Sequence, residues 1–140
     1  MTDMNEYDVF GFLNSDEINN YMNEIRGNEI DVPQIYTGTP DQGFIQNKNA
    51  PWIRITAIPG DEVTYADDKR LIEYPRVQID FWILNYKVEE LLKLEQMIYD
   101  KMFAHGFERY YKNHNRDVDM TDLQMVQGNF EYQGFSPNED

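Results

Sequence analysis

The stretch that decides the fold is Arg76-Val77-Gln78-Ile79-Asp80-Phe81-Trp82-Ile83-Leu84, the end of a longer strand signal that starts at Leu71. Apolar and polar side chains alternate along it, which is the pattern of a strand with one face in the core. The expected core face carries Val77, Ile79, Phe81 and Ile83. The opposite face carries Arg76, Gln78, Asp80 and Trp82, and an indole among polar groups predicts contact with more than solvent.

A second alternating strand is predicted over residues 51–58, with Ile53, Ile55 and Ala57 on one face and Trp52, Arg54 and Thr56 on the other. The turn Pro59-Gly60-Asp61 ends it. A shorter strand is predicted over 30–36, and Pro33 restricts that strand to a sheet edge because proline donates no ladder hydrogen bond. The residues between these strands, 37–50, are rich in turn formers and predict a loop.

Two helices are predicted. The first covers about residues 15–26, with Ser15 as its N-cap and Gly27 as its C-cap. The second covers about residues 87–104 and ends at Gly106. Its apolar stripe has one acidic interruption, Glu95.

Two more strands are predicted over 107–112 and 123–127, the latter running on toward Tyr132, with a polar connection over 113–121. This order predicts one α+β domain, with an antiparallel or mixed β-sheet of about four to five strands and two helices packed on one side. The domain covers residues 1–140, with 1–14 as an N-terminal arm and 133–140 as a flexible tail.

Charge and composition exclude several classes of protein. The chain has 26 acidic and 12 basic residues, a formal net charge of −14, and no cysteine. Such acidity disfavours broad contact with DNA phosphates, and the lack of cysteine excludes disulfides and cysteine-ligated metals. No apolar run approaches the roughly 20 residues of a membrane span. Aromatic residues make up 14% of the chain, which predicts a packed core or a substantial interface.

No residue pattern predicts catalysis, a cofactor or a bound metal. His114, Asp117 and Asp119 have ligand-type side chains, but their asparagine-rich surroundings favour a solvated turn. Asp61, Glu62, Asp67 and Asp68 form an acidic loop without the spacing of a calcium site. Pro40-Asp41 is half of a nuclease motif whose lysine-bearing strand is missing.

Several blocks of the sequence resemble a family of small tail proteins from long-tailed phages and prophages of Gram-positive bacteria. The blocks are Pro51-Trp52-Ile53-Arg54-Ile55-Thr56, Tyr65-Ala66-Asp67-Asp68, Glu73-Tyr74-Pro75-Arg76-Val77-Gln78-Ile79-Asp80-Phe81-Trp82, Gly106-Phe107-Glu108-Arg109-Tyr110-Tyr111 and Met125-Val126 with Asn129-Phe130. They follow one another in the family's order and cover about residues 50–132.

The resemblance implies a tail-completion protein similar to tail terminators. Such proteins form hexameric rings that cap the tail tube, stop its growth and offer a surface to the head. The implied partners are further copies of the chain, the tail tube protein and the head–tail connector protein, while DNA passes through without specific binding. The implied location is the host cytoplasm during assembly and then the head-proximal end of the virion tail. No catalytic residue is implied.

Candidate interface residues follow from the enrichment of tryptophan, tyrosine and arginine at binding hot spots. They are Trp52, Arg54, Arg76, Trp82, Tyr110 and Tyr111. The acidic loop of Asp61, Glu62, Asp67 and Asp68 is a candidate for the lumen of the ring. Three alternatives stay open: a connector protein at the same junction, a metal-dependent hydrolase using Asp67, Asp68 and Asp80, and an acidic regulator that mimics DNA.

Overall fold

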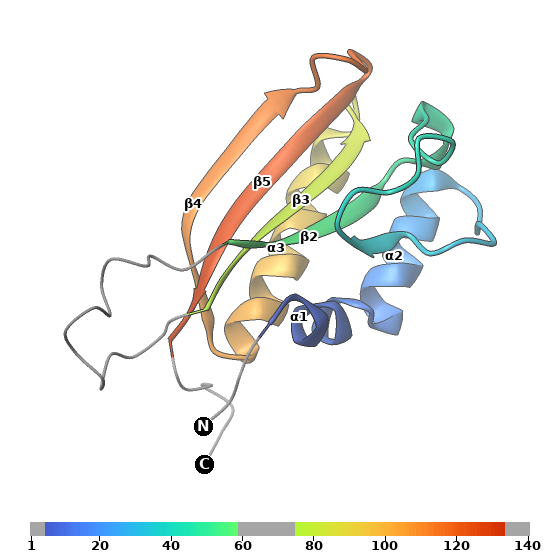
Figure 1. The fold of residues 1–140 in the computed structure, drawn as a ribbon. Coiled ribbons are helices and arrows are strands. Elements are labelled where there is room, and N and C mark those ends of the chain that lie inside the picture. Colours follow the sequence, from blue (N-terminus) through green and yellow to red (C-terminus); the bar gives the residue numbers. More distant parts are fainter. Residues whose placement is uncertain (1–4, 59–74, 134–140) are drawn as a thin grey trace.

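The computed structural model describes residues 5–58 and 75–133 of the chain. In chain order the described elements are α1 (Glu6–Leu13), α2 (Asp16–Arg26), β1 (Ile35–Thr37), the 3-10 helix η1 (Asn47–Asn49), β2 (Trp52–Ile58), β3 (Arg76–Leu84), α3 (Val88–Ala104), β4 (Phe107–Arg116) and β5 (Leu123–Tyr132). One layer is a twisted sheet and the other is formed by the three α-helices, which lie on one face of it (Figure 1).

The sheet is mixed, with the strand order β1-β2-β3-β5-β4. β1 is parallel to β2, and the other neighbouring strands are antiparallel. The predicted α+β class with a mixed sheet is therefore confirmed. β1 and β4 form the two edges. The strand predicted over 30–36 does lie at an edge, but it covers only Ile35–Thr37, so Pro33 precedes it and does not interrupt its pairing.

The ends of the first two helices follow from local sequence. The side chain of Asn5 accepts hydrogen bonds from the backbone N–H groups of Tyr7 and Asp8, and the carboxylate of Asp8 accepts one from the N–H of Asn5. This reciprocal capping box satisfies donors that a helix start leaves unpaired. Ser15 caps α2 through the N–H of Ile18, and Gly27 ends α2 with a positive φ of 91°.

α1 is a third helix that the sequence analysis did not predict. Its residues fall in the stretch expected to be an N-terminal arm, yet Val9 and Leu13 are fully buried. In the same region Phe12 stacks on the imidazole of His105, with ring centroids 3.8 Å apart. The described part of the expected arm is thus packed against the domain.

The main core lies between the helices and the inner face of the sheet. Each helix contributes apolar side chains, and β3 contributes the predicted set Val77, Ile79, Phe81 and Ile83. Val126, Phe130 and Phe107 extend the core across β5 and β4. At about 25 cal/mol per Å² of apolar surface, this burial is the dominant stabilising contribution to the fold.

A second, smaller cluster lies on the outer face of the sheet. Phe44 and Ala50 from the loop after β1 pack there against Trp52, Trp82 and Leu123. The loop predicted over 37–50 therefore covers one end of the outer face. Because of this cover, the two tryptophans on a polar strand face are removed from solvent.

Arg26, at the end of α2, holds the loops around β1 together. Its guanidinium donates to the carbonyl oxygens of Asn49 and Pro51, at 3.2 and 2.7 Å, and to the side chain of Gln34 at 2.7 Å. It also reaches Asn23 and the carbonyl of residue 28. Burial lowers the pKa of Arg26 from its ordinary value. No sequence pattern indicated this role.

The last strand pair is longer than predicted. β4 continues through residues 113–116, where the sequence predicts a polar connection, and the turn that follows occupies 117–122. These four residues are polar because they belong to an edge strand beside solvent, so composition alone indicated a loop. A bulge at Tyr110 interrupts the ladder with β5 between Arg109 and Tyr111.

Candidate functional site

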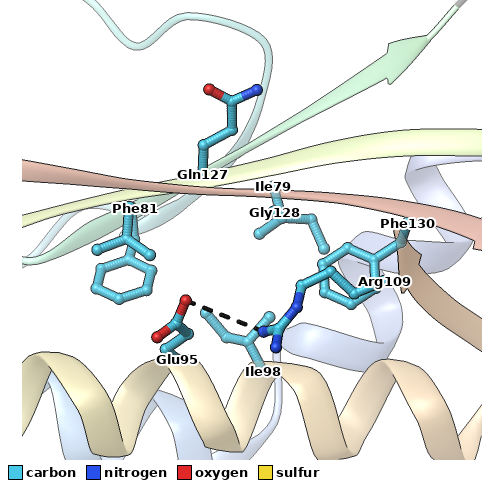
Figure 2. Close-up of a pocket in the computed structure, with 9 residues that line it drawn as sticks. Ile79, Phe81, Glu95, Ile98, Arg109, Gln127, Gly128 and Phe130 are labelled. Carbon is cyan, nitrogen blue, oxygen red and sulfur yellow. Dashed lines mark ion pairs between the residues drawn. The ribbon is translucent and has the colours of Figure 1, made fainter. Parts of the chain in front are cut away.

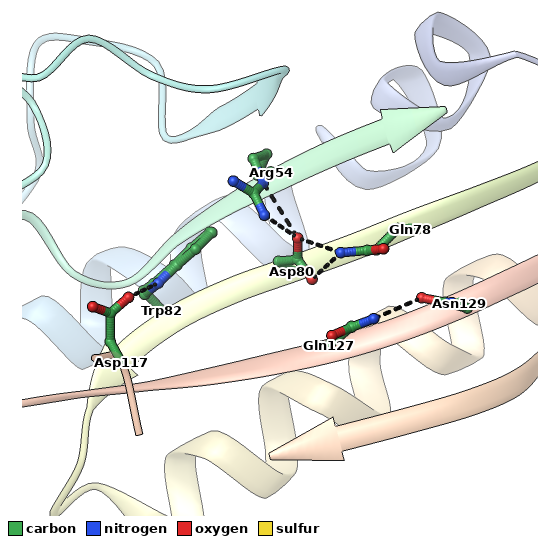
Figure 3. Close-up of polar contacts among 7 residues, drawn as sticks. All are labelled: Arg54, Gln78, Asp80, Trp82, Asp117, Gln127 and Asn129. Atoms are coloured by element: carbon green, nitrogen blue, oxygen red, sulfur yellow. Dashed lines mark hydrogen bonds and ion pairs between the residues drawn. The ribbon is translucent and has the colours of Figure 1, made fainter. Parts of the chain in front are cut away.

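A buried ion pair lies on the outer face of the sheet. Asp80 of β3 is 0% exposed, and its Oδ2 accepts hydrogen bonds from Nη2 and Nε of Arg54 on β2 at 2.6 and 3.2 Å. The side-chain amide of Gln78 donates to both carboxylate oxygens at 3.1 Å. Figure 3 shows the side chains of Arg54 and Gln78 converging on the carboxylate of Asp80. Such a pair needs these extra bonds, because desolvation of a buried charge is costly.

The two tryptophans continue this network. Trp52 and Trp82 are directly opposite in the β2–β3 ladder, and their rings stack with centroids 5.5 Å apart. The guanidinium of Arg54 lies 4.9 Å from the ring centroid of Trp82, a cation–π distance. Trp82 Nε1 donates to Asp117 Oδ2 at 2.8 Å (Figure 3).

The exposed fraction of each predicted interface residue shows whether its side chain can reach a partner. Trp52 is 1% exposed and Trp82 is 8% exposed, so the chain itself covers both rings. Arg54 is bound to Asp80, and Arg76 begins β3 opposite Glu131 of β5. Of the six residues expected at an interface, Tyr110 and Tyr111 are the two with half-exposed rings, at 50% and 47%.

Asp117 organises the turn after β4. Its Oδ1 accepts hydrogen bonds from the backbone N–H groups of Asp119 and Met120. Burial by itself would raise the pKa of Asp117, but the bonds from Met120, Trp82 and Asp119 outweigh burial and lower that pKa. These contacts make Asp117 a turn-forming residue, as the asparagine-rich surroundings indicated.

A second polar group lies between α3 and β4, on the inner face. Glu95 Oε2 is 3.0 Å from His114 Nε2 and 3.9 Å from Arg109 Nη1, and the side chain of Glu95 is 12% exposed. The acidic interruption in the apolar stripe of α3 is therefore explained by basic partners on β4. The acidic residue within an apolar stripe was a sequence signal for Glu95, but the strand predicted over 107–112 ended before its partner His114.

This polar group borders a narrow pocket between α3 and the sheet (Figure 2). Gly128 lines the pocket, and a Cβ at that position would lie 3.0 Å from Cε1 of Phe130. The missing side chain therefore gives room to the Phe130 ring. Of the polar residues around the pocket, Glu95 and Arg109 face each other as an ion pair, while the Gln127 side chain points away from it.

The described residues hold no group of three or more carboxylate, histidine or cysteine side chains that could bind a metal ion. His114 pairs with Glu95 and Asp117 faces Trp82, so the structure does not bring His114 and Asp117 together as ligands. Asp61, Glu62, Asp67 and Asp68, the expected lumen residues, lie outside the described residues. In residues 5–58 and 75–133, no helix is both long and apolar enough to cross a membrane.

Comparison with known proteins shows a similarity of fold. No protein-family model matches the sequence, and no curated protein matches it either. Among solved structures, the chain is similar to a chain of the virion of a native gene transfer agent particle. The TM-score is 0.55 and the sequence identity is 12%, and the match covers 88% of this chain and 88% of that chain. At this identity the likeness establishes a shared fold across nearly the whole length of both chains.

Proposed function

We propose that the chain is a structural protein of a phage or phage-like particle, acting as a tail terminator or tail-completion protein. It forms a ring, expected to be hexameric, that caps the tail tube and joins it to the head. The observation that carries this proposal is the fold shared with a chain of a gene transfer agent virion over 88% of both chains. The order of the tail-family sequence blocks supports the finer assignment.

The charge of the chain supports the same role. A ring through which a genome passes must not retain phosphates, and DNA-binding proteins hold phosphates mainly through lysine and arginine. With a net charge of −14, the chain repels DNA at long range. The expected partners are therefore further copies of the chain, the tail tube protein and the connector protein. The expected location is the host cytoplasm and then the head-proximal end of the tail.

The contacts of the buried Asp80 count against the alternative of a metal-dependent hydrolase. Its carboxylate is occupied by Arg54 and Gln78, so a metal ion would have to displace a guanidinium from a buried site. Calorimetry with Mg²⁺, Mn²⁺ and Ca²⁺ is expected to give no binding heat. Saturable binding that disappears in Asp80→Asn would instead support the hydrolase.

The ring function is tested by electron microscopy of the purified protein, alone and mixed with tail tubes, together with mass from light scattering. We expect rings, or a cap at one end of each tube. Binding to the head connector without binding to tubes would move the assignment to a connector protein. A chain that binds neither would refute both roles.

A further inference from the structure

β4 has an open edge. It pairs with β5 on one side, and no described strand lies on its other side. With ten residues it is much longer than β1, the opposite edge of the sheet. A long edge strand that no other strand covers leaves its side chains open to contact with another chain.

β4 is also basic in an acidic protein. Between Phe107 and Arg116 it carries three basic residues and one acidic residue, in a chain whose net charge is −14. Arg109 is paired with Glu95. Lys112 and Arg116 are exposed, and neither forms an ion pair with a described residue. Their charges are therefore available to a partner.

The opposite end of the sheet is acidic. From Glu6 to Asp31 the sequence has seven acidic residues and one basic residue, Arg26, whose guanidinium is directed into the loops. Three lysines at the start of α3 and within it also contact α2: Lys101 pairs with Glu17, Lys93 lies over the ring of Tyr21, and Lys87 donates to the carbonyl of Ile25. Glu24 at the end of α2 and Glu29 just after it are exposed. Gln34, which precedes β1, donates to the carbonyl of Asn19, so α2 is attached to the β1 side of the sheet.

Basic and acidic surfaces thus lie at opposite ends of the strand order. Figure 1 shows β4 at one side of the molecule and α2 at the other. Two complementary patches on opposite sides of one chain favour a heterologous, head-to-tail contact, which generates a ring when its rotation closes. The half-exposed rings of Tyr110 and Tyr111 lie on the basic strand and are suited to anchor such a contact.

We propose that the β4 edge of one copy binds the acidic surface of α2 and the turn after it on the next copy. The contact rests on the proposed ring function and specifies the surfaces that make the ring. Its occupant is a second copy of this chain, because the chain itself supplies both halves of a complementary pair.

The test reverses each charge patch separately. Lys112→Glu/Arg116→Glu makes both patches acidic, and Glu24→Lys/Glu29→Lys makes both basic. Each variant alone is expected to need about tenfold more protein, or more, for assembly on tail tubes, because like charges then face each other. A 1:1 mixture of the two variants is expected to assemble as the wild type does, because every junction between unlike copies is again complementary. A hexamer allows this alternation because its copy number is even.

The matched control is Lys112→Arg/Arg116→Lys, which changes the same two side chains of β4 and keeps their positive charge. It is expected to assemble like the wild type, and circular dichroism with urea unfolding checks that every variant folds. If the wild type forms no ring, the ring function fails and this contact fails with it. If the wild type forms rings but reversal on β4 has no effect, or the mixture is not rescued, the contact alone is refuted.

Discussion

Replacement of Arg54 by leucine tests the ion pair that crosses the outer face of β2 and β3. The variant leaves Asp80 without its cation while the carboxylate remains 0% exposed. Loss of one partner from a buried pair costs about 3–5 kcal/mol, whereas exposed pairs contribute about 0–1 kcal/mol. The side chain of Arg54 is 26% exposed, and Gln78 still donates to Asp80 in the variant. We therefore expect a loss of about 2–3 kcal/mol in the free energy of unfolding.

Urea unfolding followed by tryptophan fluorescence is suited to this measurement. The chain has two tryptophans, and their rings stack beside the ion pair. Arg116→Leu is the matched control, because it makes the same substitution at an exposed strand position and should change stability by less than about 0.5 kcal/mol. The double variant Arg54→Leu/Asp80→Leu should recover much of the loss, since no uncompensated buried charge remains. A loss below about 1 kcal/mol in Arg54→Leu, or a double variant no more stable than the single one, would show that Asp80 is not destabilised by losing its cation.

Four further changes test other parts of the structure. Trp82→Ala removes a buried indole with its stacking and hydrogen bond and should cost about 3–5 kcal/mol in thermal unfolding; a loss under about 1 kcal/mol would contradict its structural role. Arg26→Met removes the donors that hold the loops around β1 and should cost about 2–4 kcal/mol, with faster proteolysis of residues 28–50; unchanged proteolysis would count against it. Gly128→Ala brings a Cβ within 3.0 Å of the buried ring of Phe130 and should cost about 1–3 kcal/mol, so a stabilised variant would show that the ring can move aside. Burial, aided by Lys101, lowers the pKa of His105, so the folded state disfavours protonation of this imidazole. The free energy of unfolding should therefore be highest above the unfolded-state pKa of about 6.5 and fall as pH drops below it. His105→Phe should lack this part of the pH dependence, and the same pH dependence of stability in both proteins would show that His105 does not cause it.

Much of the fold followed from periodicity and capping. The alternation correctly placed Val77, Ile79, Phe81 and Ile83 of β3 and Ile53 and Ile55 of β2 in the core, whereas Ala57 of the same predicted face is exposed. Ser15 and Gly27 bounded α2 as expected. α1 was missed because it is only eight residues long, so its apolar pattern is brief. Its capping box, formed by Asn5 and Asp8, is the local sequence signal that marks where it begins.

The candidate site was harder to predict, because its geometry depends on contacts between distant segments. The indole of Trp82 on a polar face indicated a contact beyond solvent, but that contact is within the chain: Trp52, Arg54 and the turn at Asp117 surround it. A polar strand face does not reveal whether a loop covers it. The pairing of Glu95 with β4 likewise required knowledge of which strand lies over α3.

The central claim, that the chain terminates a tail tube, is tested most directly by the length distribution of tubes assembled from tail tube protein with and without this chain. We expect that tubes exposed to the chain stop growing and carry a ring at one end, while tubes without it continue to lengthen as more tube protein is added. Tubes that lengthen equally in both reactions, with no density added at either end, would contradict it.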